Sequence, residues 1–485
     1  MINPDATALP PETDDAPSHV AGGAPGDARQ LDAKRLYERA VAHHRQGRID
    51  EAITDYTQVA RLSPRSSDVY NHLGLALRTA GRPHGAVACF RRALALKPGT
   101  AGIYTNLGNA LSDLGEAARA VEAHRRAVKA APKSPQALLH AGLALRNVGQ
   151  AKAALEHFSR AITLEPTYAR CRVEHALTLL QMGEWRRGFK ELEIRFALAN
   201  GDPRRKGLAQ WNGSPLQGKT ILINYEGTLS TVVQFARFAS PLKHMGAKVV
   251  VECPPQLTHL LAAAPDIDAT VPPGTPLSAI PGVALQIPLF SLPARLNVEV
   301  DTLPADTAYL SVPKFGGQTL TVHPETRLAV GLVWSGLWDG RPPQGPVRPQ
   351  DMALEDLGEL FGIPGVQLFA LERGAGAGDI TKLGLQALIE PLGAGVIDMA
   401  DMAGMIDQLD LVIAVDSPAA HVAGALGKPV WMLSGAGADW SWLLDRAETP
   451  WYPSMRVFRR GPADPWVDTV SHVRKALMDV LKGTS

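Results

Sequence analysis

The 485-residue sequence predicts an α-helical repeat solenoid followed by an α/β region of two doubly wound lobes. The first observation behind this prediction is a 34-residue period that runs through residues 33–202. The second is a change after residue 216 to short β-rich runs, separated by segments long enough to form helices. The third is a hydrophobic content of 45%, which suffices for sizeable cores. A chain of this length divides into about two to four domains.

Composition restricts the class of protein. Residues 1–30 are rich in Ala, Pro, Gly and Asp without the apolar core of a secretory signal, so we expect a disordered tail. No run of about 18 apolar residues occurs, so we expect no membrane span. The three cysteines lie far apart without a CxxC pair, which is typical of a reducing compartment and predicts a cytoplasmic protein. The 49 basic and 48 acidic residues nearly cancel, so we expect no nucleic-acid partner.

The repeat region, placed at residues 31–202, carries four series of residues with the same 34-residue step. The series are Pro64, Pro98, Pro132 and Pro166; Gly47, Gly81, Gly115, Gly149 and Gly183; Gly74, Gly108 and Gly142; and Ala52, Ala86, Ala120 and Ala154. Small residues let two antiparallel helices approach, glycine suits the turn, and proline ends the second helix. A neighbouring position holds Tyr56, Phe90 and Phe158, with His124 as the exception. The pattern resembles the tetratricopeptide repeat in about five units.

Polar residues on the first helices are candidates for contact with a bound acceptor protein or peptide. In O-linked N-acetylglucosamine transferases, which this layout resembles, an asparagine ladder lines the concave face of the repeats. The corresponding positions here hold His72, Asn106 and His140, so only Asn106 matches. Two interpretations stay open: contact with an acceptor polypeptide, or exposed polar residues on a scaffold.

The fifth unit differs from the others because it lacks the closing proline and reads GEWRRGFKELEIRF. Trp185, Phe189 and Phe196 add aromatic bulk there. A terminal repeat must either cap the stack or dock on the next domain. Because the chain continues at once into a folded region, we expect docking.

Short β-rich runs indicate the α/β region. The candidate strands are residues 219–224, 247–253, 283–288, 328–334, 366–371, 394–397, 411–415 and 429–433. Their alternation with helix-length segments predicts two parallel sheets, one in a lobe at residues 203–325 and one in a lobe at 326–485. In such folds ligands lie beyond the carboxyl ends of the strands.

The strongest candidate site lies in LVIAVDSPAAHVAGALGKPVWML, residues 411–433. A buried strand would deliver Asp416 to the sheet edge, and Ser417 would cap the following helix. The first amides of that helix, including the amide of Ala419, would face a diphosphate at the positive end of the helix dipole. His421 lies on the same turn and would donate to a phosphate oxygen. The alternative is ordinary helix capping beside a histidine without a ligand.

Residues 203 to about 482 resemble bacterial tetratricopeptide-repeat proteins whose C-terminal half is similar to the heptosyltransferase-like (family nine) glycosyltransferases of the GT-B fold. The matching segments are WNGSPLQGKTILIN (211–224), QFARF (234–238), LFSLP (289–293), VGLVWSG (330–336), DMADMAGMIDQLDLVIAVDSPAAHVAGALGKPVW (398–431) and WSWLLDRAETPWYPSMRVFR (440–459). The resemblance implies an acceptor side in the first lobe and a nucleotide-sugar side in the second. It also implies that Asp416, Ser417 and His421 hold the donor diphosphate without a metal or other cofactor.

Further donor contacts are implied at two other strand ends of the second lobe. By the resemblance, Ser335 and Gly336 would approach the donor after the first strand of that lobe. Glu372 and Arg373, after its second strand, would lie near the base or ribose. For Glu372 and Arg373 a solvated turn is the alternative.

The sequence departs from the family pattern in two places. The family's glycine-rich turn ends in an aspartate, a candidate general base, where this chain has Thr231. A threonine hydroxyl cannot accept a proton near neutral pH as a carboxylate does, and Glu226 is the nearest carboxylate in sequence. Thr231 and Glu226 are therefore the candidate catalytic residues, and an ordinary surface residue is the alternative for Glu226. The second departure is the Pro- and Gly-rich segment 337–351, in which Arg341 or Arg348 would neutralise phosphate charge.

Two functions therefore remain open. The first is a glycosyltransferase that moves a sugar from a nucleotide diphosphate to an acceptor, such as a protein recruited by the repeats. The second is a degenerate transferase region that serves as a repeat-based binding scaffold. No metal is expected, because the only Asp-x-Asp pair, Asp266 and Asp268, lies in a proline-flanked turn instead of at a strand end.

Overall fold

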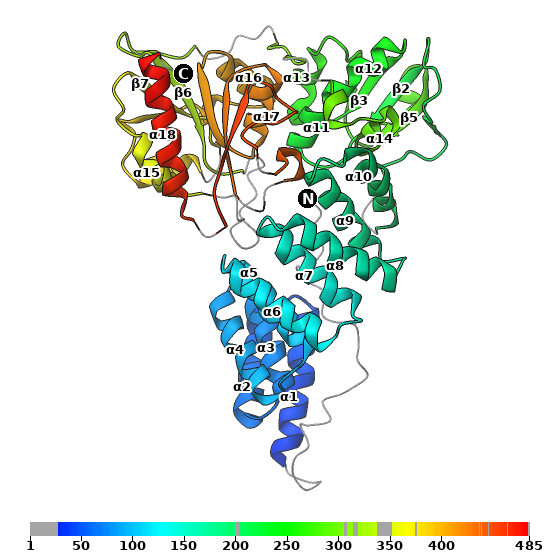
Figure 1. The fold of residues 1–485 in the computed structure, drawn as a ribbon, viewed down its shortest axis with the longest axis vertical. Coiled ribbons are helices and arrows are strands. Elements are labelled where there is room, and N and C mark those ends of the chain that lie inside the picture. The colour runs from blue at the N-terminus through cyan, green and yellow to red at the C-terminus, as the bar shows by residue number, and fades with distance from the viewer. Residues whose placement is uncertain are drawn as a thin grey trace. The chain divides into compact units, whose positions relative to one another are not determined.

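The computed structural model describes residues 28–198, 203–304, 308–313, 319–336, 352–373, 376–435, 437, 439–444, 446–462 and 464–483. The chain forms two compact units that divide between Cys171 and Arg172 (Figure 1). Arg341 and Arg348 lie outside the described residues.

The first unit is a series of antiparallel helix pairs. Its helices are α1 (Ala28–Arg45), α2 (Ile49–Leu62), α3 (Ser67–Thr79), α4 (Pro83–Leu96), α5 (Ala101–Asp113), α6 (Ala117–Ala130), α7 (Pro135–Asn147) and α8 (Ala151–Leu164). Gly81 and Gly115, in the turns within two of these pairs, have φ angles of 70° and 73°, a region that L side chains rarely adopt. The predicted helical solenoid is therefore confirmed.

The glycines within the first helices allow close packing between the two helices of a pair. A Cβ atom on Gly74 would lie 2.6 Å from the Phe90 ring, and one on Gly142 would lie 2.4 Å from the Phe158 ring. His124 takes the equivalent place in the third repeat, where a Cβ atom on Gly108 would lie 2.4 Å from its ring. Burial, with nearby His140 and Arg78, lowers the pKa of His124 to about 3. His124 therefore packs as a neutral substitute for an aromatic side chain.

The second unit contains two parallel sheets with helices. Its helices are α9 (Ala169–Gln181, which begins just before the division), α10 (Trp185–Leu192), α11 (Leu229–Phe235), α12 (Ala239–His244), α13 (Thr258–Ala262), α14 (Leu292–Leu296), α15 (Ala377–Lys382), α16 (Met399–Asp407), α17 (Pro418–Ala425) and α18 (Trp466–Lys482). Short 3-10 turns are η1 (Glu193–Ala197), η2 (Ala236–Phe238), η3 (Pro255–Leu257), η4 (Leu277–Ala279), η5 (Leu289–Ser291), η6 (Val300–Thr302), η7 (Leu354–Leu360), η8 (Gly393–Gly395) and η9 (Trp440–Trp442).

The first sheet has the order β1-β5-β2-β3-β4, and all its pairs are parallel. Its strands are β1 (Ala209–Gln210), β2 (Thr220–Asn224), β3 (Lys248–Glu252), β4 (Ala269–Val271) and β5 (Val283–Pro288). The chain moves outward from β2 to β4 and then returns to place β5 beside β2. The direction of the connections therefore reverses between β2 and β5, which is where such sheets bind ligands.

The second sheet is also parallel, with the order β11-β10-β9-β6-β7-β8. Its strands are β6 (Leu328–Val333), β7 (Val366–Ala370), β8 (Ile389–Pro391), β9 (Leu411–Val415), β10 (Val430–Ser434) and β11 (Met455–Arg459). Alternate residues of β6 and β9 belong to two hydrophobic clusters, one shared with α16 and α17 and one with α18 and η7. Helical elements thus cover both faces, and the predicted doubly wound α/β architecture is confirmed.

One predicted strand is wrong. Residues 394–397 form no strand, and the third strand of this lobe is β8, which ends at Pro391. A Cβ atom on Gly393 would lie 1.8 Å from the carbonyl oxygen of Glu372, so the chain there turns closely against another backbone segment. The apolar residues at 394–397 suggested a strand, although this close approach requires a glycine turn. Strands β1, β4 and β11 were missed as well.

Helix α10 packs inside the second unit. Trp185 is 1% exposed, and its ring centroid lies 5.2 Å from that of Trp451. Phe189 lies 5.4 Å from Trp440 and 6.5 Å from Phe235, centroid to centroid. The expected docking of the last repeat on the following domain is thus observed, because α10 shares one aromatic core with residues of both lobes.

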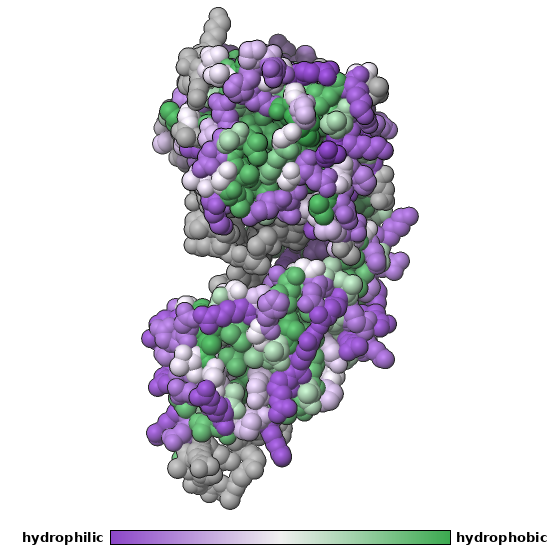
Figure 2. Space-filling view, turned by 90° about the vertical axis from the view of Figure 1, so that its left-hand side faces the viewer, coloured by the Kyte–Doolittle hydropathy of each residue, from purple (hydrophilic) through white to green (hydrophobic). Residues whose placement is uncertain are grey.

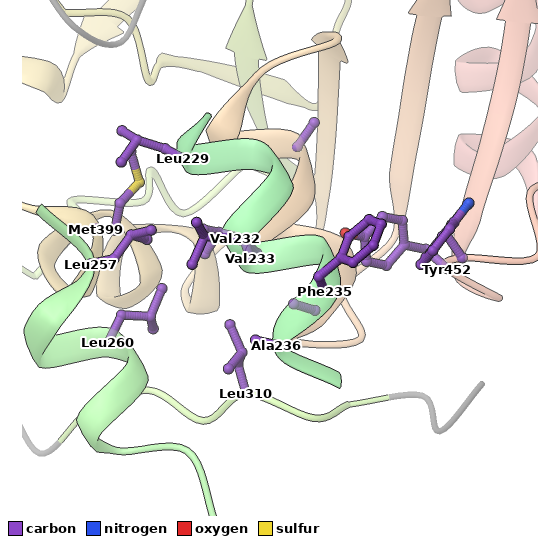
Figure 3. Packing of buried hydrophobic residues seen from close by; sticks show 14 of the residues in the cluster. Leu229, Val232, Val233, Phe235, Ala236, Leu257, Leu260, Leu310, Met399 and Tyr452 are labelled. Carbon is purple, nitrogen blue, oxygen red and sulfur yellow. The ribbon is translucent and has the colours of Figure 1, made fainter. Parts of the chain in front are cut away.

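The two lobes contact one another through α11. This helix packs against α17, and its apolar residues belong to the largest hydrophobic cluster of the unit. Figure 3 shows Val232, Val233 and Phe235 of α11 in this cluster, with Met399 of α16 and Tyr452 among the neighbouring side chains. The junction between the lobes is therefore apolar and closely packed.

The described surface is mixed in polarity. Figure 2 shows hydrophilic side chains over much of one side of both units, with apolar side chains between them. No helix among the described residues is long and apolar enough to cross a membrane.

Candidate functional site

The carboxyl ends of β6 and β9 meet where the second sheet changes direction. Ser335 and Gly336 follow β6, and Asp416 and Ser417 follow β9. A Cβ atom on Gly336 would lie 2.9 Å from the carbonyl oxygen of Asp416, so the two loops touch through their backbones. Parallel doubly wound sheets bind ligands at this kind of position. The structure thus brings these four predicted residues together.

Helix α17 begins at this same edge. The Ser417 hydroxyl accepts a hydrogen bond from the Ala420 amide at 3.3 Å, and Pro418 occupies the first helical position. Ala419 follows in the first turn and is 2% exposed. The predicted cap is therefore present, and the positive end of the helix dipole lies at the strand ends.

His421 is held on both ring nitrogens. Its Nε2 lies 3.3 Å from Oδ1 of Asp416, and its Nδ1 lies 2.8 Å from the hydroxyl oxygen of Tyr452. The other carboxylate oxygen of Asp416 accepts a hydrogen bond from Nε1 of Trp442 at 3.1 Å. The His421 side chain is 4% exposed, whereas the Asp416 side chain is 27% exposed. The carboxylate is thus the more accessible member of the pair.

Sequence reasoning missed the roles of Tyr452 and Trp442. Both lie in the segment 440–459, which matches the family pattern, but neither was among the predicted site residues. Nothing local indicates their roles, because Tyr452 lies 31 residues and Trp442 lies 26 residues from their hydrogen-bond partners.

Glu372 organises the loop after β6. Its Oε1 accepts a hydrogen bond from the Trp334 amide at 2.7 Å, and its Oε2 accepts one from the Ser335 hydroxyl at 2.7 Å. The residue is 3% exposed, and this burial raises the pKa of Glu372 to about 7. The alternative of a solvated turn is therefore wrong for Glu372, whose carboxylate fixes Ser335 at the candidate site. Arg373, beside it, donates from Nη1 to the carbonyl of Ile397 at 3.5 Å.

In the first lobe, Glu226 lies at the carboxyl end of β2 and is engaged by partners. Nε and Nη2 of Arg195 donate to its two oxygens at 3.0 Å each, and the Phe290 amide donates at 3.0 Å. The Thr231 hydroxyl forms a capping box with Thr228 at the start of α11. Both residues predicted as catalytic thus have structural partners.

The residues predicted to contact an acceptor lie on α3, α5 and α7, and each contacts a side chain of the preceding repeat. Nδ1 of His72 lies 3.0 Å from the hydroxyl of Tyr37, and burial lowers the pKa of His72. The Asn106 amide donates to Oδ1 of Asn71 at 2.9 Å. His140 stacks on His124 with ring centroids 6.0 Å apart. These three side chains therefore form no uniform ladder.

The first unit also has a groove along α4, α5 and α6. Leu94, Tyr104 and Leu107 line it, together with charged side chains such as Arg91 and Arg126. A groove lined by apolar and charged side chains is the kind of surface on which helical repeats bind polypeptides.

Metal-binding geometry is not evident in the described part of the chain, where no group of three or more His, Cys, Asp or Glu residues is arranged around a metal position. Asp268 of the Asp-x-Asp pair forms an ion pair with Nζ of Lys243 at 2.5 Å and accepts a hydrogen bond from the Val249 amide at 2.7 Å. This carboxylate therefore has a structural role.

Comparison with known proteins identifies the repeats. A family model described as tetratricopeptide repeat matches residues 32–101 and 105–169. Protein FlbA of Caulobacter vibrioides is 27% identical over 336 residues, which are 61% of this chain and 53% of FlbA. The chain therefore spans about half the length of that relative.

Solved structures of repeat proteins are similar to part of the chain. MamA from Desulfovibrio magneticus is 21% identical, with coverage of 35% of this chain and 98% of MamA and a TM-score of 0.32. YrrB, described as a TPR protein with an unusual peptide-binding site, is 18% identical, with coverage of 35% and 92% and a TM-score of 0.30. The match to the family model is what shows tetratricopeptide repeats in the N-terminal region of this chain.

Proposed function

We propose that this protein is a glycosyltransferase of the GT-B type that binds a nucleotide-diphosphate sugar at the edge of the second sheet. The observation that carries the proposal is the meeting of the β6 loop, the β9 end and the start of α17 at the point where the sheet changes direction. Helix amides supply positive potential for a diphosphate there, and an imidazole supplies an N–H donor. This arrangement would stabilise the departing diphosphate without a metal.

The side chains of this site would have two roles, because some contact the donor and others hold the contacting residues in place. The Nε2–H of His421, which lies 3.3 Å from Oδ1 of Asp416 in the free protein, would be shared with a phosphate oxygen of the donor. Ser335, whose hydroxyl donates to Glu372, would limit the approach of the donor from the β6 side. Gly336 allows the backbones of the two loops to touch, and a side chain at position 336 would collide with the carbonyl oxygen of Asp416. Arg341 and Arg348 remain proposals as phosphate contacts.

Nucleotide binding by the full chain tests the proposal. Calorimetry with a panel of nucleoside diphosphates should detect at least one that binds, and His421→Ala should weaken that affinity about tenfold, the scale of a lost charge-assisted hydrogen bond. His472, exposed on α18, provides the matched control, and His472→Ala should bind as the parent does. The proposal is wrong if no nucleoside diphosphate binds the parent, or if His421→Ala binds as tightly.

The repeats would present the acceptor. Tetratricopeptide repeats bind peptides or proteins in general, and the groove along α4 to α6 offers apolar contacts. We propose that the protein works in the cytoplasm, where the thiols of Cys89, Cys171 and Cys253 stay reduced.

A binding scaffold is the second candidate function. The engagement of Glu226 by Arg195, and of Thr231 in a helix cap, favours it, because neither side chain is poised to remove a proton from an acceptor. Release of nucleoside diphosphate from a bound sugar donor, with and without acceptor lysate, distinguishes the two. Donor binding without any turnover supports the scaffold.

A further inference from the structure

The Tyr452 hydroxyl is the nearest partner of His421, at 2.8 Å from Nδ1. Tyr452 is 1% exposed, and its ring packs directly on the backbone of α17. A Cβ atom on Gly424 would lie 2.6 Å from that ring, so only a glycine allows this approach. Figure 3 shows Tyr452 among the buried side chains of the cluster that also contains Phe235 of α11. The ring is thus fixed independently of its hydroxyl.

The hydrogens around His421 can be assigned from the chemistry of its partners. A carboxylate only accepts, so Asp416 must receive the Nε2–H of His421 as well as the Nε1–H of Trp442. In the neutral imidazole, Nδ1 is then the acceptor, and the Tyr452 hydroxyl donates to it. Burial raises the pKa of Tyr452 well above its usual value, so this hydroxyl keeps its proton.

A second tyrosine extends this arrangement towards the first lobe. The Tyr309 hydroxyl oxygen lies 3.5 Å from that of Tyr452 and 2.9 Å from the carbonyl oxygen of Val233, to which it donates. If His421 gains a proton, its Nδ1–H donates to Tyr452, whose own hydrogen then turns to Tyr309. His421, Tyr452 and Tyr309 therefore each keep a hydrogen-bond partner in both protonation states of the imidazole.

Asp416 faces the imidazole directly, and burial together with the charge of Asp416 raises the pKa of Asp439 nearby. The guanidinium carbon of Arg237 lies 5.1 Å from the centroid of the Tyr452 ring, where a cation and an aromatic face attract. The Asp416 carboxylate is the only one of these groups that bonds to His421 directly among the described residues.

We infer that Tyr452 is a positioning residue of the proposed diphosphate site. It holds the His421 imidazole as the Nε2–H tautomer towards Asp416, and it accepts the Nδ1–H when the imidazole becomes charged beside a bound diphosphate. The second part of this inference rests on the proposed function, whereas the first concerns the free protein.

Nuclear magnetic resonance of the full chain labelled with nitrogen-15 histidine tests the first part. His421→Ala identifies the signals of this residue among those of the 14 histidines. The parent should show a protonated Nε2 and an unprotonated Nδ1. Tyr452→Phe keeps the ring that packs on Gly424, and it should shift His421 towards a mixture of tautomers. Unchanged nitrogen shifts in Tyr452→Phe would overturn the inference.

Nucleotide affinity tests the second part. Tyr452→Phe should weaken binding of a nucleoside diphosphate about three- to tenfold, the scale of one hydrogen bond. Tyr309→Phe should leave the tautomer of the free protein intact and weaken binding less, because it removes only the second hydroxyl. Tyr70→Phe, in the repeats, is the matched control and should change neither measurement. Parent-like affinity in Tyr452→Phe contradicts the inference, whereas absence of binding in the parent contradicts the proposed function and leaves the tautomer result valid.

Discussion

The carboxylate of Glu226 receives two hydrogen bonds from the guanidinium of Arg195, each 3.0 Å long. Arg195 lies in η1, directly after α10, and Glu226 follows β2 of the first sheet. The two side chains are 8% and 11% exposed, and Arg195 also donates to the Ser291 hydroxyl at 2.9 Å. The pair therefore joins the end of the repeats to the edge of the first sheet where its strand order reverses.

This relationship predicts that Glu226→Gln acts on stability. Loss of the ionised partner leaves a largely buried guanidinium with weaker hydrogen bonds, which should lower the free energy of unfolding by about 1–3 kcal/mol. Turnover per folded molecule should stay within about twofold of the parent, since the parent carboxylate is already occupied. Urea unfolding and donor turnover are the measurements.

The control for this prediction is an exposed ion pair. Arg186 and Glu299 lie 3.0 Å apart with side chains 67% and 49% exposed, so Glu299→Gln should change stability by less than about 0.5 kcal/mol. Loss of turnover in Glu226→Gln at unchanged stability would instead identify Glu226 as the general base.

Glu372→Gln should alter the pH dependence of stability. Between pH 4.5 and about 7 the folded carboxyl keeps a proton that the unfolded chain has released. The folded state binds more protons in this window, so the contribution of Glu372 to stability falls as the pH rises. A glutamine cannot ionise, and the variant should gain up to about 3 kcal/mol relative to the parent between pH 4.5 and 8.

Denaturant unfolding at several pH values checks this expectation. Glu359→Gln, at an exposed position on η7, should show no such relative gain. A stability difference between Glu372→Gln and the parent that stays constant with pH would show that Glu372 is ionised in the folded protein throughout.

His124→Phe should stabilise the repeats at acidic pH. The unfolded imidazole takes up a proton near pH 6.5, whereas the folded one does so only at about pH 3. The unfolded state binds more protons in this window, so stability falls as the pH falls, by at most about 1.4 kcal/mol per pH unit. Phe90 and Phe158 fill the equivalent place in other repeats. A phenylalanine at position 124 cannot take up a proton, so the variant should not lose stability in this way as the pH falls.

Thermal unfolding of the parent and His124→Phe at pH 7 and pH 5 measures the effect. The gain in the variant should be larger at pH 5. His157→Phe, in the next repeat, serves as the control, because Nδ1 of His157 bonds to the Ala153 carbonyl and the residue is less buried. An equal gain at both pH values would contradict the burial argument.

Removal of α9 and α10 should destabilise the α/β region. A fragment of residues 203–485 lacks Trp185 and Phe189, which pack on Trp440 and Trp451. In the full chain, Trp185→Ala should cost about 3–5 kcal/mol, the usual loss for a buried tryptophan. A fragment of residues 169–485 should unfold cooperatively at a higher temperature than the shorter fragment. Equal melting temperatures would show that the α10 contacts do not stabilise the lobes.

The candidate site was predictable only in part from the sequence. The cap at Ser417 and the strand before Asp416 follow from a few adjacent residues, so local patterns predicted them. The role of Glu372 was not predictable, because its carboxylate bonds to Ser335, 37 residues away, across neighbouring strands. Strand β8 was misplaced because an apolar run suggested pairing, whereas a close backbone contact at Gly393 decided the turn.

The sequence by itself determined the helical repeats. It also determined the alternation of strands and helices that makes the second half an α/β region. Each repeat packs against its neighbours along the chain, so a 34-residue period is enough to predict it. Only the tertiary structure decided that Tyr452 and Trp442 form hydrogen bonds to the His421–Asp416 pair, and that Arg195 forms an ion pair with Glu226. These partners are distant in sequence, and the order of parallel strands and the packing of α10 bring them together. Buried polar atoms must then be paired with whatever donors and acceptors that packing supplies.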